Sequence, residues 1–228
     1  QEQALAQAAS ITAQATDIYL KGTASVVESL ATQDAIKEAF TGNAGRAQER
    51  LRSYVTAYKD YFAFFLFDAS GIIIAGVNNS DKDMTGGDRA NRDYVKSILA
   101  GQDLVFSQSV FKAATGDDLI YVVAKAMRDA NGKLLGGVAA CPLWNNFTAA
   151  TIDPLRFGQR GYGFMLDGTG HMIAHPMDKS LLLKDMSQEE LAKKALAQRD
   201  GTFHYAWNGE NKVLGVARIP ATGWVVCM

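Results

Sequence analysis

The chain has 228 residues, of which 48% are hydrophobic, and a formal net charge of −1 at pH 7. This length and composition predict a folded protein with one large or two small domains. Because acidic and basic residues are interspersed and nearly balanced, we expect neither a nucleic-acid partner nor electrostatic capture by an anionic surface.

The first part of the chain has a helical pattern. Apolar residues recur at roughly helical spacing from Ala4 to Phe40, without proline, which predicts a long and mostly exposed helix. Residues 46–58 place Leu51 and Val55 on one face of a second helix. No run of about 18 apolar residues occurs, so we expect neither a membrane span nor a signal peptide within the chain. The pattern opens inside a helix and closes inside a strand, so we expect both ends to continue in a longer protein.

The period then changes from helical to β. The sequence predicts a hairpin, a short helix and three further strands, at residues 61–67, 72–77, 91–100, 104–107, 119–127 and 133–140. In chain order this unit is two strands, a helix and three antiparallel strands.

The same order begins again after a predicted linker that contains Trp144. Strands are predicted at residues 162–166, 172–175, 202–207, 212–217 and 224–227. Ser187 to Glu190 has the spacing of a capping box, which predicts the start of a helix there, and Asn208-Gly209 is typical of a hairpin turn. We therefore predict an α+β fold with a helical stalk at residues 1–59 and two similar sheet subdomains at residues 60–150 and 151–228.

One pattern occurs twice and supports a duplication. Phe-x-x-Asp-x-(Ser/Thr)-Gly-x-x-Ile-Ala begins at Phe65 and again at Phe164. The Asp carboxylate accepts hydrogen bonds from a turn backbone and the Gly adopts positive φ readily, so each copy predicts a tight turn between two strands. We interpret Asp68 and Asp167 as scaffold residues that touch no ligand.

Further motifs resemble a known family. The run from Asp88 to Tyr94, followed by Gly101, Thr115-Gly116, the Asp129 turn and Gly136-Gly137-Val138, resembles the membrane-distal half of a double Cache domain. The stretch from Gly161 to Pro176, with Thr222-Gly223-Trp224 near the end, resembles the membrane-proximal half. Together these motifs cover most of the chain.

This resemblance implies two PAS-like subdomains and a function. Such modules are the extracytoplasmic, or periplasmic, sensors of receptors in the bacterial inner membrane, most often methyl-accepting chemotaxis receptors and less often histidine kinases or cyclic-dinucleotide enzymes. A small organic molecule binds in the distal subdomain. The resemblance also implies transmembrane helices outside this chain and a homodimer in the full receptor. We expect ligand binding to close the loop at residues 78–89 and to act on the second subdomain through the linker at Trp144.

The resemblance also suggests where the ligand binds. Arg92 and Tyr94 match the Arg and the first aromatic residue that hold the ligand carboxylate in amino-acid-sensing members. The other positions of that motif are occupied by Val95, Val110 and Cys141, so the Asp that would hold a ligand ammonium is missing. We therefore favour a small carboxylate, or another small polar organic molecule, over a zwitterionic amino acid as the ligand. An ion pair of Arg92 with a neighbouring Asp, a competing role of Arg89, and Tyr94 as a core aromatic residue remain alternatives.

Four further residues are candidate ligand contacts. Ser107 and Ser109 are expected on one face of the third strand, and Tyr121 and Lys125 on one face of the fourth. An exposed edge position is the alternative for the two serines and for Lys125, and Cys141 is most simply a small buried residue.

We expect no enzymatic activity. The sequence lacks a phosphate-binding loop, a nucleophile elbow and a zinc-protease motif, so no catalytic residue, cofactor or metal is predicted. His171 and His175 are interpreted as ordinary surface histidines. The alternative to direct sensing is an interaction module that binds a periplasmic protein.

Overall fold

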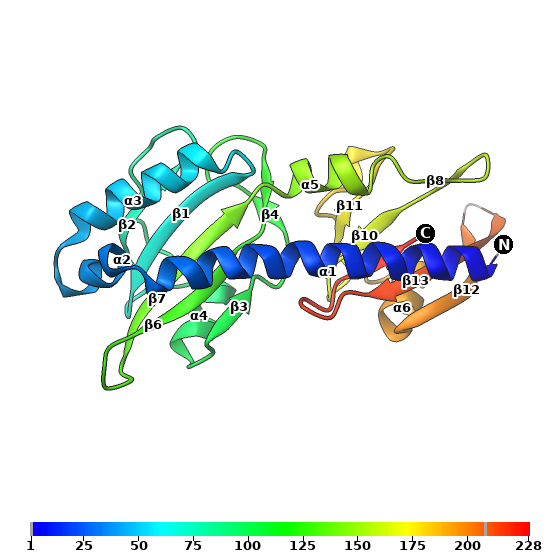
Figure 1. Cartoon of the computed structure of the whole chain (residues 1–228). Coiled ribbons are helices and arrows are strands. Elements are labelled where there is room, and N and C mark those ends of the chain that lie inside the picture. The colour runs from blue at the N-terminus through cyan, green and yellow to red at the C-terminus, as the bar shows by residue number, and fades with distance from the viewer. Residues whose placement is uncertain (1, 208) are drawn as a thin grey trace. The chain divides into compact units, whose positions relative to one another are not determined.

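The computed structural model describes residues 2–207 and 209–228 and contains two five-stranded antiparallel sheets (Figure 1). Their strand orders are β2-β1-β7-β6-β3 and β11-β10-β14-β13-β12. In each sheet the strands lie in the order second, first, fifth, fourth, third along the chain, so both sheets have one topology. The predicted α+β class and the duplication are confirmed.

The helices are α1 (Glu2–Thr32), α2 (Asp34–Glu38), the 3-10 helix Ala39–Thr41, α3 (Ala44–Ala57), α4 (Asp93–Leu99), α5 (Trp144–Thr151), the 3-10 helix Lys179–Leu181 and α6 (Glu190–Ala197). The strands of the first sheet are β1 (Tyr61–Asp68), β2 (Ile73–Asn78), β3 (Leu104–Phe106), β6 (Val123–Arg128) and β7 (Leu134–Pro142). Those of the second are β10 (Phe164–Leu166), β11 (Met172–Ala174), β12 (Asp200–Trp207), β13 (Glu210–Arg218) and β14 (Val225–Cys227). Two short ribbons are formed by β4 (Phe111–Lys112) with β5 (Leu119–Ile120) and by β8 (Arg156–Phe157) with β9 (Gly161–Tyr162).

The chain forms two compact units that do not follow its order. The first-sheet unit consists of Lys21–Ser107 and Lys112–Leu143, and the second-sheet unit of the chain as far as Leu20, Gln108–Phe111 and Trp144–Met228. Helix α1 therefore contributes residues to both units. The boundaries predicted at residues 59 and 150 stay a prediction.

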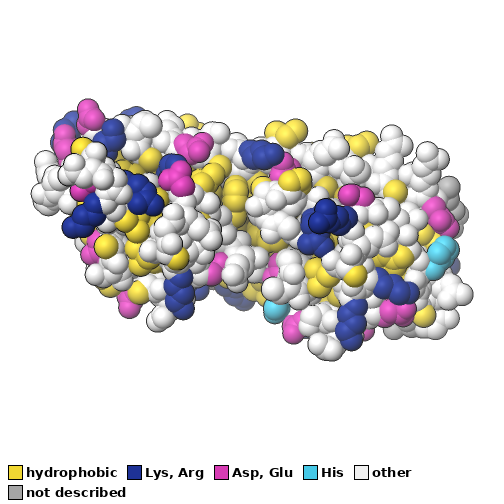
Figure 2. Space-filling view, turned by 90° about the horizontal axis from the view of Figure 1, so that it is seen from below, with side chains coloured by type: hydrophobic (Ala, Val, Ile, Leu, Met, Phe, Trp, Pro, Cys, Tyr) yellow, Lys and Arg dark blue, Asp and Glu magenta, His cyan; other side chains and the backbone are white. Residues whose placement is uncertain are grey.

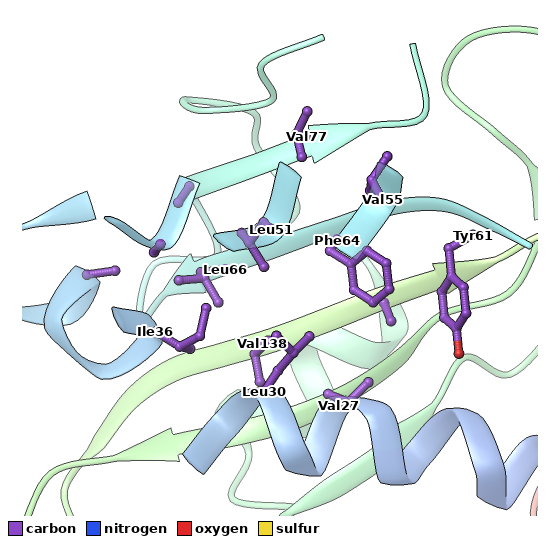
Figure 3. Packing of buried hydrophobic residues seen from close by; sticks show 14 of the residues in the cluster. Val27, Leu30, Ile36, Leu51, Val55, Tyr61, Phe64, Leu66, Val77 and Val138 are labelled. Atoms are coloured by element: carbon purple, nitrogen blue, oxygen red, sulfur yellow. The ribbon is translucent and has the colours of Figure 1, made fainter. Parts of the chain in front are cut away.

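The core of the first-sheet unit lies between one sheet face and the helices α1, α2 and α3. Its buried residues include Val27, Leu30, Ile36, Leu51, Val55, Phe64, Leu66 and Val138 (Figure 3). Full burial of a side chain of this size contributes roughly 1.5–3 kcal/mol. The long predicted helix ends earlier than Phe40, because Gln33 has extended backbone and the chain turns there to bury Ile36.

The core of the second-sheet unit combines sheet residues with α6 and with an aromatic cluster. Leu191, Ala192 and Ala195 of α6 are buried against the sheet. Trp144 lies 5.2 Å from Trp224 between ring centroids, and its indole Nε1 donates to the carbonyl of Ile173 at 2.7 Å. Trp144 thus begins α5, where the sequence predicted a linker.

The repeated turn is built the same way twice. Oδ1 of Asp68 accepts hydrogen bonds from the N–H groups of Ser70 and Ile72, and Oδ1 of Asp167 accepts from those of Thr169 and His171. The Gly of each turn has positive φ, 81° at Gly71 and 100° at Gly170.

Each repeated turn also holds the loop that leads into the following helix. The N–H of Arg89 donates to the carbonyl of Gly71 at 2.9 Å, and the N–H of Met186 donates to that of Gly170 at 3.0 Å. Three residues further on, Arg92 and Glu189 are the N-cap residues of α4 and α6, with nearly the same backbone angles. We call this turn-to-loop contact the clasp.

The start of α6 differs from the prediction. The capping-box prediction was wrong, because α6 begins at Glu190 and its N-cap Glu189 makes no side-chain capping hydrogen bond. The N–H of Ser187 instead donates to Oδ1 of Asp185 at 2.8 Å. In the predicted hairpin turn Gly209 has a φ of 77°, and Asn208 lies outside the described residues.

Figure 2 shows basic and acidic side chains interspersed over the face that it presents. This agrees with the balance of charges in the sequence, and the visible face carries no broad area of one sign.

Candidate functional site

One face of the first sheet is covered by α4 and carries two of the predicted ligand residues. The β1–β7 ladder pairs Ala63 with Cys141 and Phe65 with Ala139, which places these four side chains on one face. Tyr94 of α4 lies over it, with its ring centroid 6.5 Å from that of Phe65. The fold therefore brings Tyr94 and Cys141 together from segments 47 residues apart in sequence.

Strands β6 and β7 contribute small side chains to this face. These are Ala124 and Ala126 of β6 and Gly137, Ala139 and Cys141 of β7. At Gly137 a Cβ atom would lie 2.4 Å from the ring of Phe67, so the glycine is required to seat that ring. The sheet thus presents α4 with a floor of small side chains, rimmed by aromatic rings from β1.

Tyr94 lies over this floor and Cys141 belongs to it, and both side chains are neutral donors. Tyr94 is 2% exposed, yet no hydrogen-bond partner for its hydroxyl lies among residues 2–207 and 209–228. Burial raises the pKa of Tyr94 well above its ordinary value and raises the pKa of Cys141 to about 12. The buried side-chain atoms without a partner in the described part of the chain are instead Asp153 Oδ1, Asp167 Oδ2 and Arg218 Nε. The Tyr94 hydroxyl remains a donor that an occupant with an acceptor could use.

The guanidinium groups of Arg89 and Arg92 influence both Tyr94 and Cys141. The positive charges of Arg89 and Arg92 both oppose the burial effect by lowering the pKa of Tyr94 and of Cys141, whereas Asp93 raises that of Tyr94. Arg92 is exposed at the N-cap of α4. Arg89 is half-buried, and its Nη1 donates to the carbonyl of Asp88 at 2.7 Å. The structure keeps both arginines as candidates for an anion contact.

The clasp positions the loop that carries Arg89. Besides the hydrogen bond from Arg89 to Gly71, Ile72 forms a β-bridge with Asp88. A Cβ atom on Gly71 would lie 2.6 Å from the Cα of Ala90, so the two backbones touch at this point. The β1–β2 turn is therefore a support for the binding loop.

Tyr121 and Lys125 lie on the other side of the sheet. Lys125 pairs with Val138 in the β6–β7 ladder and shares the face of Val138, which belongs to the core under α1. Its Nζ forms an ion pair with Oδ2 of Asp103. The hydroxyl of Tyr121 lies 3.0 Å from that of Thr23 on α1. Neither residue converges with Tyr94.

The two serines do not share a strand face as predicted, because β3 ends at Phe106. Ser107 is buried, and its Oγ accepts a hydrogen bond from the N–H of Val122 at 3.0 Å. Ser109 belongs to the second-sheet unit, where its side chain contributes to lowering the pKa of Asp167. The prediction failed because the chain leaves the β3–β6 ladder after Phe106, so neither serine belongs to the strand.

A separate hollow of about 1090 Å³ lies in the second-sheet unit, lined by the start of α1, the β8–β9 ribbon and β13. Its charged lining residues include Arg160 and Glu210, which are exposed and lie 3.7 Å apart between Nη1 and Oε1. None of the ligand residues predicted from the sequence lines it.

The prediction of surface histidines was wrong for His175, which is buried, with its Nδ1 accepting from the N–H of Asp178 at 2.9 Å. Nδ1 of His171 lies 3.5 Å from Oδ2 of Asp167. Among the described residues no group of three or more His, Cys, Asp or Glu is placed to hold a metal ion. None of the described helices combines the length and apolar character needed to cross a membrane.

Sequence reasoning missed the floor of the site. The alternation of Ala63, Phe65 and Phe67 along β1, and the Gly-Ala-rich sequence of β7, were signals for a crowded aromatic rim opposite small side chains. They predict the floor only when the register of β1 with β7 is known, because that register decides which side chains share a face.

Comparison with known proteins identifies the family. A family model of the Cache domain matches residues 1–228. The chain therefore belongs to the Cache domain family, as the sequence motifs indicated.

The related sequences and structures are receptors. Two methyl-accepting chemotaxis proteins of Bacillus subtilis strain 168 are similar: TlpB is 25% identical over 142 residues, or 62% of this chain, and McpA is 22% identical over 179 residues, or 78%. These matches span only 20% and 25% of the length of the two relatives.

Solved structures share the fold over nearly the whole chain. The ligand-binding domain of the amino-acid chemoreceptor PctC of Pseudomonas aeruginosa PAO1, in complex with GABA, is 24% identical with a TM-score of 0.77 and coverage of 99% of this chain and 97% of that one. The extracellular domain of mmHK1S-Z2, which is named as a histidine kinase, is 12% identical with a TM-score of 0.82 and coverage of 99% and 95%.

Proposed function

We propose that this Cache domain is the extracytoplasmic sensor of a transmembrane chemoreceptor and binds a small organic molecule between α4 and the first sheet. The observation that carries the proposal is the meeting of Tyr94, which is 2% exposed and makes no side-chain hydrogen bond within the described residues, with Cys141 and the charges of two guanidinium groups. A donor that protein atoms leave unsatisfied, next to positive charge, suits an anionic or oxygen-rich ligand.

The favoured ligand is a small carboxylate without an ammonium group. A planar guanidinium binds a carboxylate through two parallel hydrogen bonds, and the Tyr94 hydroxyl would add a third donor. Cys141 occupies the position at which amino-acid-sensing relatives are expected to carry an Asp, and its raised pKa keeps it neutral. An ammonium group would therefore meet a thiol and two positive charges. The similar domains PctC and PctB of P. aeruginosa bind GABA and L-Gln, which both carry an ammonium group, so the proposed ligand class separates this chain from them and rests on Cys141.

The receptor context rests on the curated relatives. Both are methyl-accepting chemotaxis proteins four to five times as long as the matched part of this chain. We infer that this domain lies on the periplasmic side of the inner membrane and that transmembrane helices outside these 228 residues link it to a cytoplasmic output.

A homodimer along α1 is part of the same proposal. Ile11 and Ile18 of α1 are 59% and 71% exposed and lie seven residues apart, so they share one face of the helix. The buried residues of α1, such as Ala9 and Leu20, lie on the opposite side. Large apolar side chains on the outer face of a helix suit packing against a second copy.

Thermal shift with a panel of small acids tests the sensing proposal. We expect acetate, pyruvate, lactate or another short carboxylate to raise Tm, while glycine and alanine do not. Saturation at 100 times Kd stabilises by about 2.7 kcal/mol, which is about 5–10 °C for a chain of this size. The shift should be lost in Tyr94→Phe and in the double variant Arg89→Ala/Arg92→Ala, and kept in Lys96→Ala, which removes an exposed positive charge from the same helix. A panel in which only zwitterionic amino acids stabilise the protein would contradict the ligand class.

A second candidate is a sensor with another output, in a histidine kinase or a cyclic-dinucleotide enzyme. It is supported by the fold shared with the extracellular domain of mmHK1S-Z2. The third hypothesis is an interaction module that binds a periplasmic protein. In that case no small molecule would shift Tm, and the protein would still dimerise.

A further inference from the structure

We propose that Gln108–Phe111 is a tether that mechanically couples the edge of the first sheet to the second-sheet unit. The chain leaves the first-sheet unit after Ser107, contributes these four residues to the second-sheet unit and returns at Lys112. The inference goes beyond ligand binding, because it concerns how a displacement in one unit reaches the other.

The tether begins at a short edge strand. Strand β3 is three residues long, lies at the edge of the sheet and pairs with β6 in the described part of the chain. Helix α4, which carries Tyr94, packs on β3 as well as on β6 and β7. A short edge strand with one neighbour is among the cheapest elements of a sheet to displace, so a shift of α4 would act on β3 directly.

Ser107 anchors the end of this strand within the first-sheet unit. Its N–H donates to the carbonyl of Val122 at 2.8 Å, and its Oγ accepts from the N–H of Val122 at 3.0 Å. The residue is 2% exposed, so both hydrogen bonds are sheltered from water. Ser107 therefore moves with the segment that leads into β6.

The next residue is held by the second-sheet unit. Nε1 of Trp224 donates to the carbonyl of Gln108 at 2.9 Å, and Trp224 is fully buried against Trp144. Because consecutive Cα atoms are 3.8 Å apart, the two anchors leave the backbone between Ser107 and Gln108 no slack.

Ser109 adds a second attachment, at the repeated turn. Burial alone would raise the pKa of Asp167, but hydrogen bonds from the Ser109 side chain, His171 and Thr169 outweigh it and lower that pKa. In the first copy of the turn, the hydrogen bonds to the Asp68 carboxylate come from the turn backbone, at Ser70 and Ile72. We therefore place a second attachment of the tether at Asp167, whose Oδ2 is buried and unpartnered within the described residues.

Hydrogen exchange measured by mass spectrometry on the ligand-free protein tests the tether. Trp224→Phe keeps an aromatic ring but removes the donor to Gln108, so we expect about tenfold faster exchange at residues 107–111 and in β3. Trp144→Phe is the matched control, because it also removes a buried indole donor to a backbone carbonyl, but that carbonyl, of Ile173, lies outside the tether.

Ser109→Ala gives an independent variant with less risk to folding. It should raise exchange in the same residues, whereas Ser70→Ala in the first copy of the turn should not. The tether is disproved if Trp224→Phe and Ser109→Ala accelerate exchange only within residues 144–228, or if Trp144→Phe accelerates β3 equally. Since no ligand enters the measurement, its outcome is independent of the proposed sensing function.

Discussion

The hydroxyl of Tyr121 lies 3.0 Å from the hydroxyl of Thr23, and both residues are buried. Tyr94 is buried to a similar degree, but its hydroxyl has no such partner among the described residues. The two tyrosines should therefore respond differently to the same substitution. We expect Tyr121→Phe to lower the free energy of unfolding by about 1–2 kcal/mol, because it leaves the Thr23 hydroxyl buried with one partner fewer. Tyr94→Phe should cost less than half as much, as measured by urea denaturation followed by circular dichroism. Equal losses would mean that Tyr94 has a structural partner.

The clasp predicts a large difference between two glycines. Gly71 and Gly116 have nearly the same φ, 81° and 84°, but a Cβ atom would meet Ala90 only at Gly71, and nothing lies within 4 Å at Gly116. We expect Gly116→Ala to cost about 1 kcal/mol from backbone conformation alone, and Gly71→Ala to cost at least about 2 kcal/mol more. Chemical denaturation of both variants provides the comparison. Similar costs would show that the contact with Ala90 relaxes freely.

Burial of Cys141 predicts a loss of stability at alkaline pH. The folded state keeps the thiol neutral, with its pKa raised to about 12, so above the ordinary thiol pKa the unfolded chain releases a proton that the folded chain retains. The stabilising contribution is complete below about pH 9 and is lost as the pH rises from there toward 12, at a rate approaching 1.4 kcal/mol per pH unit. Cys141→Ala should show a shallower decline over this range, measured by denaturation under reducing conditions. Parallel pH profiles for the two proteins would contradict the prediction.

The outer face of α1 predicts a charge-sensitive dimer. We expect the double variant Ile11→Asp/Ile18→Asp to shift the protein from dimer to monomer in analytical ultracentrifugation, because two charges would be buried in an apolar contact. Thr56→Asp/Ala114→Asp, which adds the same charge at two exposed positions of the first-sheet unit, serves as the control. A wild-type protein that is monomeric at millimolar concentration would instead confine dimerisation to the full receptor.

The duplicated fold was predictable because its signals are local. The Asp68 carboxylate bonds to backbone groups within four residues of itself, and alternation along each strand is visible without knowledge of its partners. The family motifs placed Arg92 and Tyr94 in the predicted helix at residues 91–100, and in the structure Arg92 is the N-cap of α4 and Tyr94 lies in its first turn.

The composition of the site was less accessible to sequence analysis, for a geometric reason. Tyr121 and Lys125 were grouped with Tyr94 because strand periodicity says which side chains share a face, but not which face the helix α4 covers. Similarly, nothing near Ser109 in the sequence signals that the chain crosses into the second-sheet unit for four residues. Such relationships depend on partners about 60 to 120 residues away, such as Asp167 and Trp224.

The clasp has a consequence for how new specificities arise. It fixes the start of a helix at the same place on both sheets. The residues at that start differ in charge and size, because Arg92 at α4 corresponds to Glu189 at α6 and Tyr94 corresponds to Leu191. The contact depends on the backbone and on glycine, so it tolerates exchange of these side chains. A change of ligand, or the transfer of a binding site from one half of the protein to the other, would therefore require only a few substitutions on an unchanged frame.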